Sequence, residues 1–275
     1  MINGWNCEKY VKDCLNSIFS QTEGDYDYCV YIIDDGSTDK TYSELLKYKK
    51  RFKHKIKLYK NDVNKGAAFS RFKVLKGLKN SDTVVVLLDL DDYLDKDTFK
   101  IISEKYLNGQ NIKMTIGEFI STDGVKYVNG YYDNNTIDEQ TYSKHSKFKV
   151  PALRTFKSEL IKPLVKELFL NPNGKWLMSC TDVALMISLM KQLKSENIQI
   201  IKQSLYIYRK KRRDNTVGRF SSKKKRVLFK RIVDRLEKII YKDGKYNIVD
   251  YPPKQNRKNT NYNRLITRSK NRRRV

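Results

Sequence analysis

The densest group of reactive side chains in this 275-residue sequence is Asp89-Leu90-Asp91-Asp92. Three carboxylates within four residues repel one another, and they follow residues 83–88, an apolar run that predicts a buried strand. Burying such a cluster is costly without a positive partner. A divalent cation with oxygen ligands relieves that cost and could also hold a diphosphate. A solvated acidic turn is the alternative that these residues alone leave open.

A second polar cluster, Asp34-Asp35-Gly36-Ser37, follows the β-branched and aromatic run at residues 28–33. A carboxylate at a strand end can accept a hydrogen bond from a base N–H group or a ribose hydroxyl. Glycine at the third position lets the backbone approach a ligand closely. The alternative is a helix N-terminus whose acidic residues match the helix dipole. That alternative suits Ser37 and Asp39 better than the two aspartates before the glycine.

The elements that must position these clusters alternate between helix and strand over residues 1–106. Apolar residues three and four apart predict helices, and short β-branched runs predict strands. This alternation with short loops predicts an α/β fold with a mainly parallel sheet. Ligands bind at the carboxyl ends of strands in such sheets, so both acidic clusters are expected at one edge. The expected helices are 8–20, 41–48, 66–78 and 97–106, and the expected strands are 28–33, 56–59 and 83–88.

The pattern changes after residue 107. Residues 113–120 and 126–132 predict two strands, and residues 133–149 are polar and loop-like. Residues 182–193 predict a helix, and residues 198–208 a further strand. An amphipathic stretch at 227–240 precedes an Asn-, Arg- and Lys-rich end, of which residues 256–275 are expected to be flexible.

Charge is concentrated at one end of the sequence. Lys and Arg number 57 against 31 Asp and Glu, and residues 201–275 hold 26 basic and 5 acidic side chains. Residues 1–220 therefore predict an ordinary globular part, and residues 221–275 a basic extension. The extension could contact anionic lipid, contact nucleic acid electrostatically, or be solvated. No zinc-finger or RNA-binding signature supports nucleic acid.

Composition excludes several classes of protein. Hydrophobic residues make up 39% and aromatic residues 12%, which excludes global disorder. The longest aliphatic run, residues 84–88, is far shorter than the roughly 20 apolar residues of a membrane span. Without a recognisable leader, a cytoplasmic location is expected. Four cysteines without a CxxC pair predict reduced thiols.

Four segments, in this order, carry a resemblance to a known family. They are WNCEKYV at 5–11, IDDGSTDKT at 33–41, NKGAAFSR at 64–71 and LDLDD at 88–92. Each is weak alone, but together, at this spacing, the sequence resembles the family-2 glycosyltransferases, which have the GT-A fold. The resemblance implies a Rossmann-like mixed sheet with helices on both faces. It also implies metal-dependent, inverting transfer of a sugar from a nucleotide diphosphate, expected to be UDP.

The resemblance also implies roles for individual residues. Asp34 and Asp35 would hold uracil or ribose. Asp91 would bind Mn²⁺ or Mg²⁺ bridging the two phosphates, with Asp89 on the ribose or the metal. A bridging cation stabilises the charge that builds on the leaving phosphate. The implied nucleotide-sugar contacts are Asn6, Glu8, Asp34, Asp35, Lys65, Arg71, Asp89 and Arg209.

The second half of the sequence resembles the family more loosely. Asp182 takes the place of the family's catalytic base, which would remove the proton of the acceptor hydroxyl in a single displacement. Thr181 stands where the family has Glu, and an acidic residue that begins a helix is the alternative role for Asp182. Residues 205–217 resemble a late family segment in which Arg209 or Arg213 could neutralise diphosphate. The alternative is that these arginines open the basic extension.

One departure is that only residues 1–4 precede the first matching segment, so the family's first strand is expected to be missing, either because it is lost or because the given start is internal. This leaves a non-catalytic nucleotide or sugar binder as an alternative function, and a nucleic-acid-binding protein as a weaker one. The expected organisation is a nucleotide-sugar-binding half (1–106), an acceptor-binding half (107–220) and the basic extension (221–275). The expected acceptor is a glycan, a lipid-linked molecule or a protein, with peripheral contact at the inner membrane surface through the extension.

Overall fold

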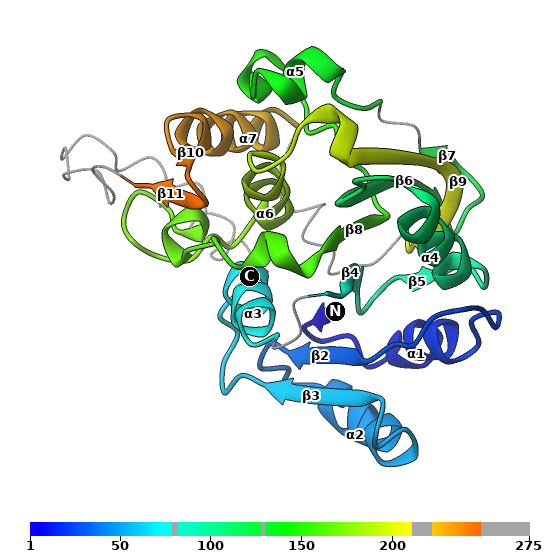
Figure 1. Ribbon diagram of the computed structural model, residues 1–275. Helices are drawn as coiled ribbons and strands as arrows, with labels where there is room; N and C mark the ends of the chain where they lie inside the picture. The colour runs from blue at the N-terminus through cyan, green and yellow to red at the C-terminus, as the bar shows by residue number, and fades with distance from the viewer. Residues whose placement is uncertain (79–81, 128–129, 211–221, 249–275) are drawn as a thin grey trace.

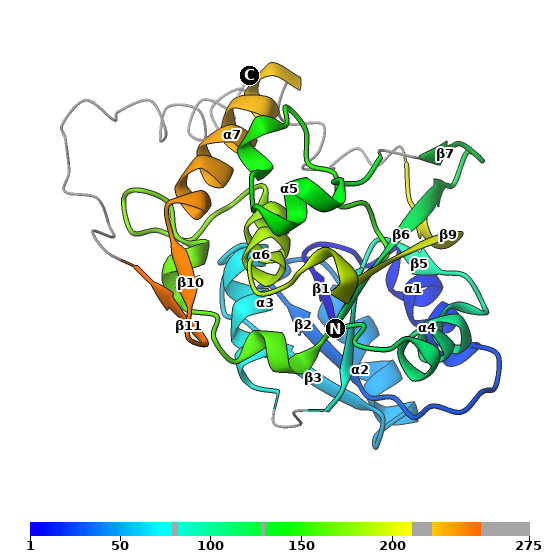
Figure 2. The ribbon, with the colours of Figure 1, turned by 45° about the horizontal axis from the view of Figure 1, so that its top comes forward.

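The structure is a computed structural model that describes residues 1–78, 82–127, 130–210 and 222–248 (Figures 1 and 2). The strands are β1 (Ile2–Gly4), β2 (Val30–Asp34), β3 (Ile56–Lys60), β4 (Val84–Asp89), β5 (Tyr93–Leu94), β6 (Met114–Ser121), β7 (Lys126–Tyr127), β8 (Arg154–Lys157), β9 (Ile198–Tyr208), β10 (Ile240–Lys242) and β11 (Lys245–Asn247). The α-helices are α1 (Val11–Phe19), α2 (Thr41–Arg51), α3 (Ala67–Lys76), α4 (Thr98–Asn108), α5 (Asn134–Asp138), α6 (Thr181–Met190) and α7 (Ser222–Glu237). Short 3₁₀ helices are η1 (Tyr142–Lys144), η2 (Ser158–Ile161), η3 (Lys166–Phe169) and η4 (Ser195–Asn197).

The described strands form one large mixed sheet and a small hairpin of β10 and β11. The large sheet has the order β3-β2-β1-β4-β8-β6-β9-β5, with β7 paired to β6. The first four strands of this order are parallel, as predicted. Beyond β4 the sheet is mixed, because β8 runs antiparallel to both β4 and β6.

Helices cover both faces of the large sheet. On one face, apolar side chains of α1, α2 and α4 pack with β1 to β3. On the other face, α3, α6 and α7 pack with β4, β6 and β8. The helix α1 shows why the periodicity was readable, because its buried residues Val11, Cys14, Leu15 and Ile18 recur at three- and four-residue steps.

The expectation that the first strand is missing is wrong. Residues Ile2–Gly4 form β1, which pairs in parallel with β2 on one side and β4 on the other. Three residues that include Asn3 and Gly4 carry no strand pattern of their own, so pairing on both sides decides the conformation. Gly4 is also required by packing, because an added Cβ would lie 2.5 Å from Leu90 Cβ.

The loop expected at residues 133–149 contains α5 and η1. Asp133 caps α5, because its side chain accepts a hydrogen bond of 2.8 Å from Thr136 N. The strand expected at 126–132 is shorter, and the amphipathic stretch at 227–240 divides into the end of α7 and the start of β10. The flexible segment expected at 256–275 lies outside the described residues.

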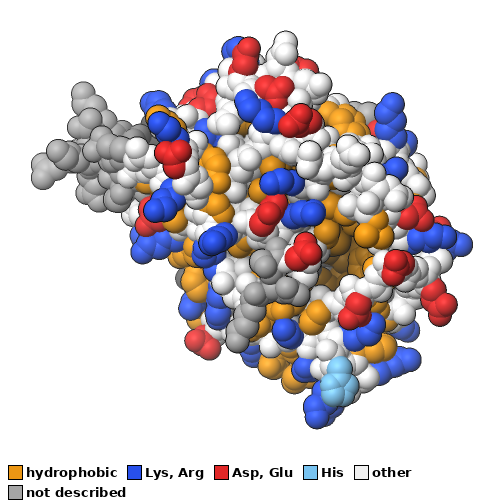
Figure 3. Space-filling model, viewed as in Figure 1, with side chains coloured by type: hydrophobic (Ala, Val, Ile, Leu, Met, Phe, Trp, Pro, Cys, Tyr) orange, Lys and Arg blue, Asp and Glu red, His pale blue; other side chains and the backbone are white. Residues whose placement is uncertain are grey.

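The surface carries charges of both signs. Figure 3 shows Lys, Arg, Asp and Glu interspersed on one face, which is hollowed to the right of centre with hydrophobic side chains in the depth. Among the described residues, no helix has the length and apolar character needed to cross a membrane.

Candidate active site

The two acidic clusters meet at one edge of the sheet, as predicted. Asp34 ends β2 and Asp89 ends β4, and β1 lies between these strands. The register pairs Gly4 with Asp34 and Asn3 with Asp89. The parallel strands thus bring carboxylates that are 55 positions apart in the sequence to the two sides of β1.

The turn after β4 gathers three carboxylates. One oxygen from each of Asp89, Asp91 and Asp92 lies within 4.8 Å of the others. Asp92 is buried, and its carboxylate accepts hydrogen bonds from Tyr206 Oη at 2.6 Å and Arg209 N at 2.8 Å. Burial, followed by the charges of Asp91 and Asp89, raises the pKa of Asp92 to about 8. Carboxylate oxygens that are crowded together and repel one another suit a hard divalent cation.

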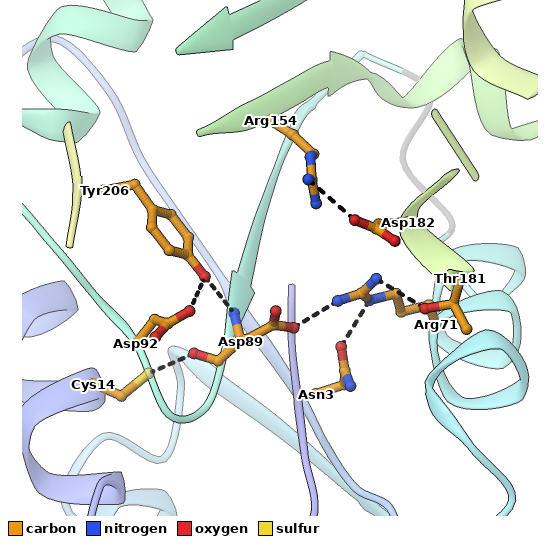
Figure 4. A network of polar contacts seen from close by, with 9 residues as sticks. All are labelled: Asn3, Cys14, Arg71, Asp89, Asp92, Arg154, Thr181, Asp182 and Tyr206. Carbon is orange, nitrogen blue, oxygen red and sulfur yellow. Dashed lines mark hydrogen bonds and ion pairs between the residues drawn. The ribbon is translucent and has the colours of Figure 1, made fainter. Parts of the chain in front are cut away.

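Arg71 connects this turn to the start of α6. Its side chain is buried, and Nε donates to Asn3 Oδ1 at 2.8 Å. Nη2 lies 2.5 Å from Asp89 Oδ1, and Nη1 lies 3.4 Å from Thr181 Oγ1 (Figure 4). A buried guanidinium therefore stands between the acidic turn and the helix that carries Asp182.

Asp182 lies in the first turn of α6, where the helix dipole favours a negative charge. Its Oδ2 is 3.2 Å from Arg154 Nη2, and Figure 4 shows the two side chains pointing toward each other. Arg154 is held from the other side, because its Nε donates to Val150 O at 2.9 Å. The side chain of Asp182 keeps about a third of its surface exposed to solvent.

Asp34 and Asp35 face different partners. Asp35 is tied to the loop before α3, accepting from Lys65 N at 3.0 Å and Gly66 N at 2.8 Å. Asp34 accepts from Ser37, while its Oδ2 is buried and has no hydrogen-bond partner among the described residues. Burial raises the pKa of Asp34. A buried acceptor without a donor fits a ligand N–H or O–H group.

Asn6 and Glu8 hold the turn after β2 in place. Asn6 Oδ1 accepts from Thr38 N, and Glu8 Oε2 accepts from Lys40 N, each at 2.9 Å. The side chains of Asn6 and Glu8 therefore both have hydrogen-bond partners within the protein. Their direct contact with a nucleotide sugar stays a prediction.

The remaining predicted cations lie in different surroundings. Lys65 places Nζ 4.9 Å from the centre of the Phe69 ring. Arg209 is drawn to the back of the acidic turn, with Nε on Asp91 O at 2.9 Å and Nη2 on Asp13 Oδ2 at 2.7 Å. This geometry favours a role in shaping the turn. Arg213 lies outside the described residues.

Sequence reasoning missed Asn3, Arg154 and Tyr206. Tyr206 lies in the segment 205–217 that was noted for its resemblance to the family, and Arg154 begins β8. Neither residue type by itself indicated a functional role, because each residue acts through a partner that is distant in the sequence. Asn3 was hidden by the apparent absence of β1.

Comparison with known proteins shows the family of this chain. The chain matches the family described as "Glycosyl transferase family 2" over residues 3–165, which is more than half of its length. It belongs to glycosyltransferase family 2. This family-2 chain is 29% identical over 150 residues to glycosyltransferase GlyA of Streptococcus pneumoniae, covering 50% of this chain and 20% of that protein. It is 35% identical over 97 residues to the poly(ribitol-phosphate) β-N-acetylglucosaminyltransferase TarS of Staphylococcus aureus, covering 35% of this chain and 16% of TarS.

Solved structures share the fold of this family-2 chain. Residues 1–349 of S. aureus TarS in complex with UDP-GlcNAc align with a TM-score of 0.61 at 19% identity, covering 84% of this chain and 64% of that one. A mannosyltransferase from Pyrobaculum calidifontis in complex with GDP-Man and Mn²⁺ aligns with a TM-score of 0.50 at 18% identity, covering 79% and 59%. The expected GT-A fold is confirmed. The chain spans about a fifth of the length of the curated relatives it matches first.

Proposed function

We propose that this chain is a metal-dependent, inverting glycosyltransferase that takes a sugar from a nucleotide diphosphate, UDP being the expected carrier. The observation that carries the proposal is the pair of contacts that Arg71 makes with Asp89 and with Thr181. Through these contacts Arg71 connects the carboxylate cluster to the start of the helix that bears Asp182. Family membership and the UDP-GlcNAc complex of TarS support the reaction class and the carrier.

The donor would bind across the carboxyl ends of β1, β2 and β4. Asp34 offers its unpartnered oxygen to the base or ribose, and the loop held by Asp35 brings Lys65 to the same side. Arg71 supplies positive charge toward the diphosphate. Asp89 and Asp91 would hold Mn²⁺ or Mg²⁺, which when bound stabilises negative charge on the leaving diphosphate. Asp92 already accepts hydrogen bonds from Tyr206 and Arg209, so it would support the turn rather than act as a main metal ligand.

Asp182 would act as the general base. Its carboxylate accepts the proton of the acceptor hydroxyl while that oxygen forms a bond to C1 of the sugar. The bond from C1 to the diphosphate oxygen breaks in the same step, and its electron pair leaves with the nucleoside diphosphate. Attack from the opposite face inverts C1. Arg154 keeps Asp182 oriented while the site is without substrate.

The acceptor and the location of the enzyme are further parts of the proposal. A glycan, a lipid-linked molecule or a protein would supply the hydroxyl in the cytoplasm, and the basic extension would bring the enzyme to the inner membrane surface. The basic residues beyond 248 lie outside the described residues, so that contact rests on charge alone. The division of the chain at residues 106 and 220 into a nucleotide-sugar-binding half, an acceptor-binding half and a basic extension likewise stays a prediction.

The proposal is tested by thermal shift with UDP, GDP, CDP and dTDP, each with and without Mn²⁺. A ligand at about 100 times its Kd should add about 2.7 kcal/mol of stability. We expect a shift for UDP that requires Mn²⁺ and disappears in Asp91→Ala. No shift with any nucleotide from a folded sample would reject the donor site.

The non-catalytic alternative is separated by turnover. A binder would shift with UDP but would release no nucleoside diphosphate from its sugar donor. The reason for keeping this alternative was the strand expected to be missing, and the presence of β1 removes that reason.

A further inference from the structure

The segment between η3 and α6 leads directly to the proposed catalytic base. We define the strap as residues 170–180, which end two residues before Asp182. Leu170 and Trp176 pair in an antiparallel bridge, so the first part of the strap is a hairpin. Arg235 of α7 donates a hydrogen bond to the carbonyl oxygen of Leu170. The start of the strap is therefore held by α7, and its other end determines where α6 begins.

The strap also lies on the loop before α3, which we propose to contact the donor. In this loop, Gly66 N donates to Asp35 at 2.8 Å. A Cβ added to the same glycine would lie 2.7 Å from Met178 Sδ. The Trp176 ring lies 5.3 Å from the Phe69 ring of α3, measured between ring centres. Met178 therefore rests on the backbone that Asp35 holds.

Met178 is only partly covered by this contact. It leaves 43% of its surface exposed, whereas Leu177 beside it is 1% exposed. A methionine side chain is flexible and adapts to irregular surfaces, and covering it removes apolar area from water. A ligand that binds on the loop before α3 and also covers Met178 would thus favour one position of the strap.

Cys180 makes the turn from the strap into α6 in a strained conformation. Its φ is +53°, and its side chain makes no hydrogen bond that caps the helix. This left-handed region is uncommon for residues other than glycine, and such strain persists only where surrounding contacts hold it. Before this turn, Met178 contacts Gly66. After it, Thr181 Oγ1 lies 3.4 Å from Arg71 Nη1 (Figure 4). The turn that begins α6 is therefore held by two contacts with the proposed donor side of the site.

We propose that the strap couples the binding of a nucleoside diphosphate to the position of Asp182, and that Met178 is the positioning residue. The proposal rests on the proposed function, because it takes the loop at Gly66 as part of the donor site. A ligand shifts a conformation only by as much as its affinity for the two states differs. Burial of Met178 beneath the bound donor supplies that difference, and the strap transmits it through Cys180 to the first turn of α6.

The test follows the rate at which iodoacetamide alkylates the Cys180 thiol in the full chain carrying Cys29→Ser. Cys29 is exposed and is therefore replaced, whereas Cys7 and Cys14 are buried and Cys180 is half-buried. A half-buried thiol reacts when its segment opens locally, so the rate reports how often the strap opens. We expect saturating UDP with Mn²⁺ to slow alkylation about threefold or more relative to Mn²⁺ alone.

Three variants separate coupling from general stability. Met178→Ala should keep the UDP thermal shift and lose the slowing of alkylation, because its shorter side chain no longer reaches Gly66. Met178→Leu nearly conserves the volume of the side chain and should restore the slowing. The matched control is Leu107→Ala in α4, which truncates a side chain that is 67% exposed and should behave as the parent chain does.

Slowing that persists in Met178→Ala would overturn the proposal, because UDP would then protect Cys180 without Met178. An alkylation rate that rises by the same factor with and without UDP in this variant would assign Met178 a purely structural role and would overturn it as well. A UDP thermal shift without slowing in the parent chain would reject the strap alone. No thermal shift with any nucleotide would reject the donor site, and with it the coupling that depends on that site.

Discussion

Arg71 Nη2 lies 2.5 Å from Asp89 Oδ1, and this half-buried contact connects α3 to the end of β4. The same guanidinium donates to Asn3 at the end of β1. One side chain thereby fixes the strand that sequence reasoning took to be absent and the turn that we propose to hold the metal.

Replacing Arg71 should therefore affect both stability and donor binding. Arg71→Met leaves Asn3 and Asp89 without their donor, and we expect a loss of about 2 kcal/mol in the free energy of unfolding. Arg71→Lys keeps the charge but loses the fork, so it should fold better than Arg71→Met and still bind UDP at least tenfold more weakly than the parent chain. Urea unfolding and UDP thermal shift measure the two effects, with Lys50→Met as the exposed control. Unchanged UDP binding in Arg71→Lys would contradict the assignment to the diphosphate.

The metal-free protein should become less stable as pH rises. The pKa of Asp92 is about 8 in the folded protein, against an ordinary value of about 4 in the unfolded chain. The folded state binds the proton more tightly, so stability falls between about pH 4 and about pH 8 and levels off above that. Melting temperatures in EDTA across this range test the trend, and Asp92→Asn should flatten it.

The affinity for metal should also depend on the proton that Asp92 binds. A cation at Asp89 and Asp91 competes with the proton on Asp92, so the apparent Kd for Mn²⁺ should fall as pH approaches 8. Calorimetric titration at several pH values measures this. A Kd that does not change with pH would place the cation away from Asp92.

The hydroxyl of Tyr206 should contribute to stability and to metal-dependent binding separately from its ring. Tyr206→Phe removes the donor to Asp92 and leaves the packing unchanged, so we expect a loss of about 1 kcal/mol. Mn²⁺-dependent UDP binding should weaken with it, because Asp92 and the turn lose a fixed position. Tyr59→Phe, at an exposed ring, is the control and should change neither quantity.

Asp182→Asn should separate chemistry from binding. Loss of a general base costs on the order of a hundredfold or more in rate, while UDP binding should stay in place because Asp182 is not itself one of the proposed nucleotide contacts. Release of UDP from the donor in the presence of acceptor measures the rate, and Asp25→Asn is the exposed control. Full activity in Asp182→Asn would remove Asp182 from the mechanism.

Gly36 tests the contact between the two loops of the proposed donor site. It has φ +69°, and an added Cβ would overlap the backbone of Val63. Gly124 has φ +80° with nothing within 4 Å of an added Cβ. Both alanine variants carry the strain of a positive φ, about 1 kcal/mol, so the further loss in Gly36→Ala reports the contact. We expect Gly36→Ala alone to weaken UDP binding.

The sequence by itself determined the elements whose residues repeat their pattern locally. The buried stripe of α1 and the apolar strand β4 were readable because helix and strand periodicity lie within one segment. The two acidic clusters were placed at one sheet edge for the same reason, since parallel strands end on the same side. Family membership was readable because four short segments kept their order and spacing.

Only the tertiary structure decided what depends on partners distant in the sequence. Ile2–Gly4 is a strand because β2 and β4 pair with it on both sides, not because of its composition. Arg154 and Tyr206 gain their importance from Asp182 and Asp92, which lie 28 and 114 positions away. Burial and electrostatic shifts arise from packing between such segments, so no local pattern in the chain records them.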